Sequence, residues 1–111
     1  MEMGLSKKLV LVTGSTKGIG KAIAKEFARE GADVVINGRK AEDVAKVVSA
    51  LKEEFPQTSP QAAPFDITDE TARNQLLEQF PEVDVLVNNM GIFQPMEYEA
   101  ITDAVWNRFF Q

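Results

Sequence analysis

The 111-residue sequence contains neither cysteine nor histidine. Without cysteine there is no disulfide and no thiol nucleophile, and without histidine there is no Ser-His pair and no histidine-ligated metal site. No apolar run approaches the roughly 20 residues that a membrane-spanning helix needs, and residues 1–8 lack the apolar core of a signal peptide. These absences predict a cytoplasmic chain without a metal site or membrane contact.

Positive charge is scarce in most of the sequence. Residues 1–40 hold eight Lys/Arg and four Asp/Glu, whereas residues 41–111 hold four Lys/Arg and thirteen Asp/Glu. The acidic remainder argues against nucleic acid as a partner, because DNA and RNA carry dense negative charge. The basic first third instead suits a small anionic ligand.

A glycine-rich stretch lies in this basic third. Residues 13–20 read Thr-Gly-Ser-Thr-Lys-Gly-Ile-Gly, directly after an apolar run at 9–12 and at the start of a helical pattern of Ile19, Ile23 and Phe27. A strand, a glycine turn and a helix in this order form a phosphate-binding site, because the helix begins with unpaired N–H groups and the positive end of its dipole. The sequence therefore predicts a diphosphate-binding turn at 13–20.

The spacing of this motif separates it from that of the ATPases. The ATPase loop reads Gly-x4-Gly-Lys-Ser/Thr, but Ile19 occupies the position of its second glycine and Ala22 follows Lys21. The motif here is Gly-x3-Gly-x-Gly. We expect Gly14 to adopt a conformation closed to other residues, and Gly18 and Gly20 to allow close approach.

The alternation of apolar runs with helical periodicity predicts an α/β fold. Strands are expected at 8–13, 34–36, 61–65 and 83–87, and helices at 18–30, at 41–55, from a cap at Thr68 to about residue 80, and beyond a cap at Thr102. Pro64 weakens the third strand. Such alternation gives a parallel sheet of order 3-2-1-4 between two helical layers. Residues 1–111 are thus predicted to be the N-terminal portion of one Rossmann-type dinucleotide-binding domain.

The expected sheet stops before a fifth strand. Val85, Leu86 and Val87 would then form an apolar edge, and Trp106, Phe109 and Phe110 would be poorly covered. Two explanations remain open: the polypeptide continues beyond residue 111, or the edge is buried against a second copy. The first is favoured, because no helix-stop signal precedes Gln111.

Three motifs together resemble the short-chain dehydrogenase/reductase family, in particular its 3-oxoacyl-carrier-protein reductase and glucose dehydrogenase branches. They are the glycine turn with its strand (11–20), Asp66-Ile67, and Leu-Val-Asn-Asn-Met-Gly at 86–91, in which Met90 replaces the usual alanine. The resemblance covers the whole chain. It implies a homo-oligomeric oxidoreductase that moves a hydride between a nicotinamide cofactor and a small carbonyl or secondary alcohol.

The resemblance also implies roles for individual residues. The glycine turn would line the diphosphate and the adenosine ribose, Arg39 would lie at the ribose 2′ position, Asp66 and Ile67 would flank the adenine, and Asn89 and Gly91 would lie beneath the cofactor. The residues of the turn in this set are Gly14, Ser15, Thr16, Lys17, Gly18, Ile19 and Gly20.

The residues after the second strand favour NADP over NAD. A carboxylate there would bind a free 2′-hydroxyl and repel a 2′-phosphate. Residues 37–39 contain no carboxylate, but they contain Arg39, whose planar guanidinium suits a phosphate. Lys17 would add a second positive charge.

The residues of proton transfer in this family are not found in the sequence. The family uses a Tyr-x-x-x-Lys pair and a serine, but the single tyrosine, Tyr98, is followed four positions later by Thr102. No catalytic residue is therefore predicted, and residues 1–111 alone are expected to be inactive. A non-catalytic dinucleotide-binding or scaffolding module is the alternative. A methyltransferase is disfavoured, because such proteins lack the Asn-Asn-x-Gly after the fourth strand.

Overall fold

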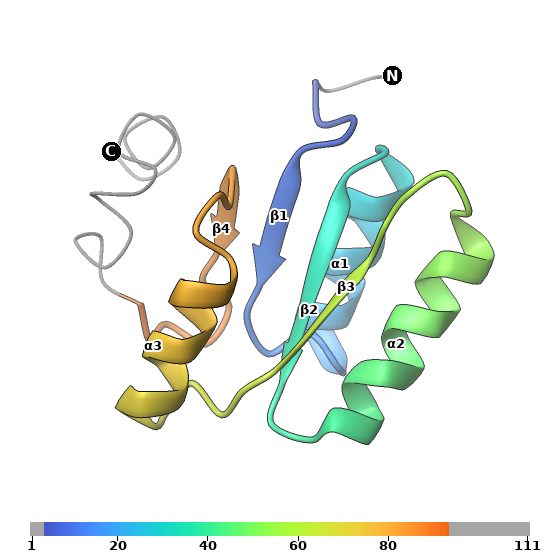
Figure 1. The fold of residues 1–111 in the computed structure, drawn as a ribbon. Coiled ribbons are helices and arrows are strands. Elements are labelled where there is room, and N and C mark those ends of the chain that lie inside the picture. The colour runs from blue at the N-terminus through green and yellow to red at the C-terminus, as the bar shows by residue number, and fades with distance from the viewer. Residues whose placement is uncertain (1–3, 94–111) are drawn as a thin grey trace.

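A four-stranded parallel sheet forms the centre of the computed structural model, which describes residues 4–93 (Figure 1). The strands lie in the order β3-β2-β1-β4, and all three pairings are parallel. Their bounds are Leu9–Val12 for β1, Asp33–Gly38 for β2, Gln61–Pro64 for β3 and Val85–Val87 for β4. The predicted fold class and strand order are confirmed.

Helices cover both faces of the sheet (Figure 1). Helices α1 (Gly18–Arg29) and α2 (Ala41–Glu54) lie on one face, and α3 (Glu70–Gln79) lies on the other. Because side chains alternate along a strand, β1 supplies both cores: Val10 and Val12 pack with α1 and α2, whereas Leu11 packs on the side of α3. The unbroken apolar run of β1 therefore reflects burial on both faces, as parallel sheets require.

The start of α3 differs from the sequence-based expectation. Thr68 was expected as the N-cap, but the cap is Asp69, whose Oδ2 accepts the backbone N–H of Ala72 at 2.9 Å. The hydroxyl of Thr68 instead donates to Oδ1 of Asp66 at 2.6 Å, and its backbone N–H donates to the same oxygen at 3.1 Å. The prediction of Thr68 as N-cap is wrong, because Asp66 binds the hydroxyl that would have capped the helix.

Two strand predictions are refined by the side chains at the strand ends. β4 is shorter than the expected 83–87. Just before it, the carboxylate of Asp84 accepts the backbone N–H of Leu9 at 2.8 Å, in place of a backbone carbonyl of a longer strand. Pro64 ends β3, opposite Gly38. β3 tolerates this proline because it lies at the edge of the described sheet, where a missing N–H breaks no ladder.

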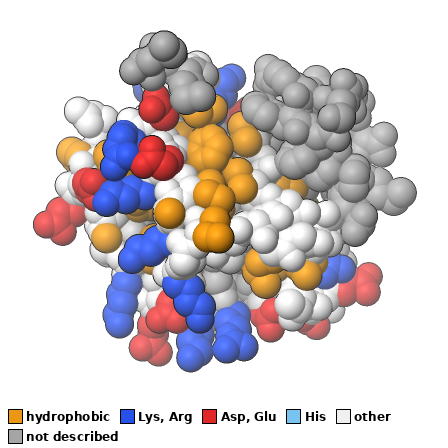
Figure 2. Space-filling view, turned by 180° about the vertical axis from the view of Figure 1, so that it is seen from behind, with side chains coloured by type: hydrophobic (Ala, Val, Ile, Leu, Met, Phe, Trp, Pro, Cys, Tyr) orange, Lys and Arg blue, Asp and Glu red, His pale blue; other side chains and the backbone are white. Residues whose placement is uncertain are grey.

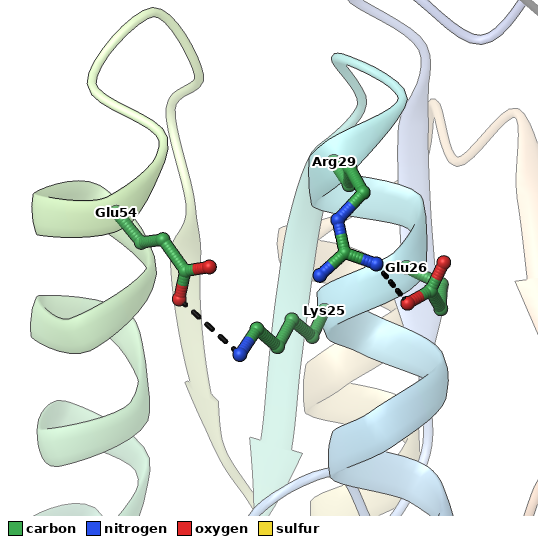
Figure 3. A network of polar contacts seen from close by, with 4 residues as sticks. All are labelled: Lys25, Glu26, Arg29 and Glu54. Atoms are coloured by element: carbon green, nitrogen blue, oxygen red, sulfur yellow. Dashed lines mark hydrogen bonds and ion pairs between the residues drawn. The ribbon is translucent and has the colours of Figure 1, made fainter. Parts of the chain in front are cut away.

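Polar contacts on the surface link the two helices of one layer (Figure 3). Nζ of Lys25 on α1 lies 3.4 Å from Oε1 of Glu54 on α2, and Arg29 pairs with Glu26 within α1. All four side chains are about half exposed, so each pair contributes less than about 1 kcal/mol to stability. The buried core between α1, α2 and the sheet therefore contributes most to holding this layer.

The outer side of β4 carries a shallow apolar hollow. Within residues 4–93 no strand pairs with this side of β4. A hollow of about 370 Å³ lies there, lined by Ile23 and Phe27 of α1 and by residues 85–89. Figure 2 shows hydrophobic side chains running down the middle of the face that α1 and α2 cover.

Several sequence-based expectations lie outside the described residues. These are the helix after Thr102, the loop that contains Tyr98, and the exposure of Trp106, Phe109 and Phe110. Among residues 4–93, no helix combines the length and the apolar character needed to cross a bilayer.

Candidate functional site

The glycine turn joins β1 to α1 through a close approach of two glycines. Gly14 has φ of +59°, a left-handed conformation that favours glycine. Gly20 lies so close to this turn that a Cβ added to it would be 2.2 Å from the carbonyl oxygen of Gly14. Both glycines are therefore required by the path of the chain, as the sequence predicted from their spacing.

The first turn of α1 offers unpaired donors. Its N-cap, Lys17, makes no capping hydrogen bond through its side chain, and no acidic residue lies in the first turn. In the part of the chain that the structure describes, the backbone N–H groups of Gly18, Ile19 and Gly20 have no acceptor. Three free N–H groups at the positive end of a helix dipole form a binding site for an anion.

A cavity of about 360 Å³ lies beside this turn, at the carboxyl ends of three strands. Ligands of open parallel sheets bind at this edge. The residues that follow β1, β2 and β3 line it together with the start of α2 and Met90. The full lining is Gly14, Thr16, Lys17, Asn37, Gly38, Arg39, Lys40, Asp43, Phe65, Asp66, Ile67, Thr68 and Met90.

The structure brings half of the predicted site residues into this cavity. Those that line it are Gly14, Thr16, Lys17, Arg39, Asp66 and Ile67, and those that do not are Ser15, Gly18, Ile19, Gly20, Asn89 and Gly91. Of the second group, Ser15 to Gly20 belong to the turn and the start of α1, whereas Asn89 and Gly91 follow β4. Ile19 is exposed at the start of α1, and Asn89 directs its amide toward the carbonyl oxygen of Gly14, at 3.4 Å.

The cavity wall carries an excess of positive charge. Lys17, Arg39 and Lys40 are exposed cations of this wall, and none of them forms an ion pair with any residue of 4–93. Two carboxylates, those of Asp43 and Asp66, line the same space. Cations without a protein partner at the mouth of a cavity attract an anionic ligand.

The carboxylate of Asp66 is held in its ionised form. The pKa of Asp66 is lowered below its ordinary value of 3.8. The largest cause is the hydrogen bond from the Thr68 hydroxyl; the backbone N–H of Thr68 and, to a smaller extent, the charge of Arg39 act in the same direction. Burial acts in the opposite direction but does not prevail. At neutral pH Asp66 therefore presents a hydrogen-bond acceptor to the cavity.

The sequence-based reasoning missed Asn37. This residue is 1% exposed and follows the buried core of β2. Its side chain accepts the N–H of Gly14 at 3.1 Å and donates to the carbonyl oxygens of Ala63 and Phe65, both at 3.0 Å. The only signal in the sequence was a polar residue at the end of an apolar strand, which also fits an ordinary turn.

Comparison with known proteins agrees with this geometry. The family model of the short chain dehydrogenases matches residues 8–111. The chain belongs to this family. It is 50% identical over 111 residues to the uncharacterized oxidoreductase YvaG of Bacillus subtilis, and 37% identical over 124 residues to a 3alpha-hydroxysteroid dehydrogenase of Mediterraneibacter gnavus. These matches cover 100% and 96% of this chain, but only 42% and 49% of the two relatives.

Solved structures of short chain dehydrogenases show the same fold. L-sorbose reductase from Gluconobacter frateurii, complexed with NADPH and L-sorbose, matches with a TM-score of 0.75 and 34% identity, over 80% of this chain and 35% of that protein. A 7alpha-hydroxysteroid dehydrogenase complexed with NADH matches with a TM-score of 0.68 and 34% identity, over 76% of this chain and 34% of that protein. The relatives thus bind nicotinamide dinucleotides, of both the phosphorylated and the unphosphorylated kind.

Proposed function

We propose that this chain is the NADP-binding part of a short-chain oxidoreductase that transfers a hydride between NADP(H) and a carbonyl or secondary alcohol. The observation that carries the proposal is a set of three cations, Lys17, Arg39 and Lys40, on the wall of the cavity beside the glycine turn, which form no ion pair within residues 4–93. A dinucleotide with a 2′-phosphate carries more negative charge than one without, so it gains more from this wall.

The described residues fit the parts of such a cofactor. The free N–H groups of Gly18, Ile19 and Gly20 would hold the diphosphate. Arg39, after β2, would bind the 2′-phosphate through two parallel N–H groups of its planar guanidinium, a geometry that a lysine ammonium does not offer.

The remaining predicted contacts surround these two phosphate sites. Ionised Asp66 would accept a hydrogen bond from the adenine amino group, with Ile67 beside the ring. Gly14, Thr16 and Lys17 would border the adenosine ribose, and Ser15 would shape the turn from within, because it is buried. Asn89 and Gly91, after β4, would lie beneath the cofactor.

The bound cofactor supplies or accepts the hydride, and this chain's own residues position it. No residue of the sequence is assigned to proton transfer, so the catalytic acid of the whole protein is proposed to lie outside residues 1–111. Relatives named as dehydrogenases and reductases act on hydroxysteroids and sugars, which supports a small carbonyl or alcohol as the substrate. The homo-oligomeric state and the cytoplasmic location expected from the sequence remain predictions.

Calorimetric titration of the full-length protein with NADPH and NADH tests the proposal. We expect NADPH to bind at least about tenfold more tightly, because charged hydrogen bonds to the 2′-phosphate each contribute about 1.5–3 kcal/mol. Arg39→Asp removes the donor and adds a repelling carboxylate, so it is expected to abolish this preference while NADH binding persists.

Lys46→Asp is the matched control, because it makes the same change of charge on the exposed surface of α2 outside the cavity. It is expected to leave the preference for NADPH unchanged. Equal affinities of the wild-type protein for both cofactors, unchanged by Arg39→Asp, would refute the NADP assignment. Failure to bind either cofactor would refute the proposal as a whole.

A further inference from the structure

We propose that Asn37 is a positioning residue that fixes the width of the cofactor cavity by linking the glycine turn to the end of β3. This inference rests on the function proposed above and adds a residue to it. Asn37 lines the cavity, is 1% exposed, and hydrogen-bonds to segments that follow two other strands. Asn37 is proposed to affect cofactor binding indirectly, through its hydrogen bonds to Gly14 and Phe65.

The first half of the link runs from β2 to the glycine turn. Oδ1 of Asn37 accepts the backbone N–H of Gly14 at 3.1 Å. The backbone of Asn37 pairs with Ser15 in both directions, since its N–H donates to Oγ at 2.9 Å and its carbonyl oxygen accepts the N–H of Ser15 at 2.8 Å. The hydroxyl and the backbone N–H of the buried Ser15 are therefore both bonded to Asn37, and these bonds hold the glycine turn against the end of β2.

The second half of the link runs from β2 to the end of β3. Nδ2 of Asn37 donates to the carbonyl oxygens of Ala63 and Phe65, at 3.0 Å in each case. Phe65 directly precedes Asp66 and Ile67, the residues proposed to bind the adenine. The paired residues end at Val12 in β1 and at Pro64 in β3. Beyond these ends, the carboxamide of Asn37 links the glycine turn to the segment that carries the adenine contacts.

A carboxamide on a short side chain has the chemistry that this position uses. The side chain must accept one N–H and donate to two carbonyl groups, and a carboxamide has one acceptor and two donors in that arrangement. A carboxylate would face two carbonyl oxygens, and an apolar side chain would leave buried backbone groups without partners. All three side-chain bonds are satisfied in the structure, as a buried polar group requires.

The width of the cavity determines how the adenosine half binds. Gly14 and Thr16 lie on one side of the cavity and Asp66 and Ile67 on another, with Asn37 lining it as well. If this side-chain link is removed, the strand ladders and the backbone bonds between Asn37 and Ser15 remain, but the segments beyond the ends of β1 and β3 lose one restraint on their spacing. The adenosine half of the cofactor would then bind less tightly, whereas the nicotinamide half would be little affected.

Asn37→Leu in the full-length protein is the first test, because leucine has the same number and branching of side-chain heavy atoms as asparagine and its side chain forms no hydrogen bond. NADPH, adenosine 2′,5′-bisphosphate and reduced nicotinamide mononucleotide are each titrated by calorimetry. We expect the affinity for NADPH and for the bisphosphate to fall at least about fivefold, which corresponds to one unsatisfied buried group. The affinity for the mononucleotide is expected to stay within about twofold of wild type.

A second, cofactor-free readout follows the amide of Gly14. In protein labelled with ¹⁵N-glycine, this amide is expected to exchange slowly with solvent in the wild type and faster in Asn37→Leu. If Asn37→Leu does not fold, Asn37→Thr replaces it, because a β-branched residue suits a strand while its hydroxyl is too short to reach both Gly14 and Phe65.

Thr58→Val is the matched control. Thr58 is 4% exposed and donates its hydroxyl to the carbonyl oxygen of Phe55 at 2.7 Å, in the connection between α2 and β3 and outside the cavity. Thr58→Val likewise removes a buried polar contact, so this variant is expected to lower stability without changing the affinity for NADPH, the bisphosphate or the mononucleotide.

Two results would overturn the inference while leaving the proposed function intact. The first is a variant at Asn37 that binds NADPH and the bisphosphate as the wild type does. The second is an equal loss for all three ligands together with an unchanged exchange rate at Gly14, which would indicate a general structural role. Failure of the wild-type protein to bind NADPH, NADH or the bisphosphate would instead count against the proposed function.

Discussion

Gly20 lies against Gly14 with no room for a side chain between them, because a Cβ on Gly20 would be 2.2 Å from the carbonyl oxygen of Gly14. The same Cβ would be 2.7 Å from Nδ2 of Asn89. This contact brings the first turn of α1 onto the end of β1 and aims its free N–H groups past the turn. The close approach of two glycines therefore determines where an anion can bind.

Gly20→Ala is expected to lower both stability and affinity for NADPH. Alanine favours a helix by up to about 1 kcal/mol over glycine, but the clash with backbone atoms exceeds this gain and forces α1 away from the turn. We expect a net loss of about 1–3 kcal/mol in the free energy of unfolding, measured by urea denaturation, and weaker binding of NADPH in calorimetry.

The control for Gly20→Ala is Lys46→Ala, which places an alanine on the exposed surface of α2 without a clash. It is expected to leave stability within about 0.5 kcal/mol of the wild type. A Gly20→Ala variant as stable as the wild type, with unchanged affinity for NADPH, would show that the two elements are not in close contact.

Thr68→Val is expected to raise the pKa of Asp66 toward its ordinary value. The Thr68 hydroxyl is the largest cause of the lowered pKa, and valine removes it while keeping the backbone N–H. A lowered folded-state pKa adds stability above the unfolded pKa, and this stability is lost as pH falls through the folded pKa. In the variant, this contribution to stability should therefore be smaller, and its loss should be complete at a higher pH. Carbon-13 NMR titration of the Asp66 carboxyl measures the shift.

Thr71→Val, on α3, removes a hydroxyl that does not bond to Asp66 and serves as the control. The Asp66 titration should be unchanged by it. If Thr68→Val and Thr71→Val both left the pKa of Asp66 as in the wild type, the hydrogen bond from the Thr68 hydroxyl would not be its main cause.

Lys52→Met is expected to reduce stability without affecting cofactor binding. Nζ of Lys52 donates to the carbonyl oxygens of Pro56 at 3.0 Å and Thr58 at 2.8 Å, in the loop after α2. Methionine keeps most of the apolar stem but leaves both carbonyl groups without this donor, which costs about 1–2 kcal/mol. Urea denaturation measures the loss. A Lys52→Met variant with altered affinity for NADPH would contradict the separation of this loop from the cavity.

The sequence predicted the framework of the site because local signals carry it. The apolar residues of β1 and β2, and the helical spacing of Ile23 and Phe27 in α1, follow from burial alone. The glycines of the turn follow from the backbone path that a strand-to-helix connection of this kind needs. The order of the four strands then followed from right-handed crossovers.

The details that the sequence did not predict depend on tertiary contacts. Thr68 and Asp69 are both good N-cap residues. Asp69 caps α3 because the Thr68 hydroxyl is already bonded to Asp66. Asn37 came directly after the strand expected at 34–36, as many turn residues do, and its three side-chain partners lie 23 to 28 positions away in the chain. No periodicity in the sequence reports such partners.

The direction of the Met90 side chain is another detail that the sequence did not predict. Its replacement of alanine in the Asn-Asn-x-Gly motif was visible in the sequence, but its direction was not. The structure places its side chain against Gly14, where a Cβ would be 2.8 Å from Cγ of Met90, and on the wall of the cavity. Met90, the residue that departs from the usual motif, therefore contacts Gly14 of the glycine turn.

The crystal structure of the full-length protein with NADPH would test the account most directly. The account predicts the diphosphate within hydrogen-bonding distance of the N–H groups of Gly18, Ile19 and Gly20, and the 2′-phosphate paired with the guanidinium of Arg39. A cofactor whose diphosphate lies away from this helix start, or whose 2′-phosphate points away from Arg39, would contradict it.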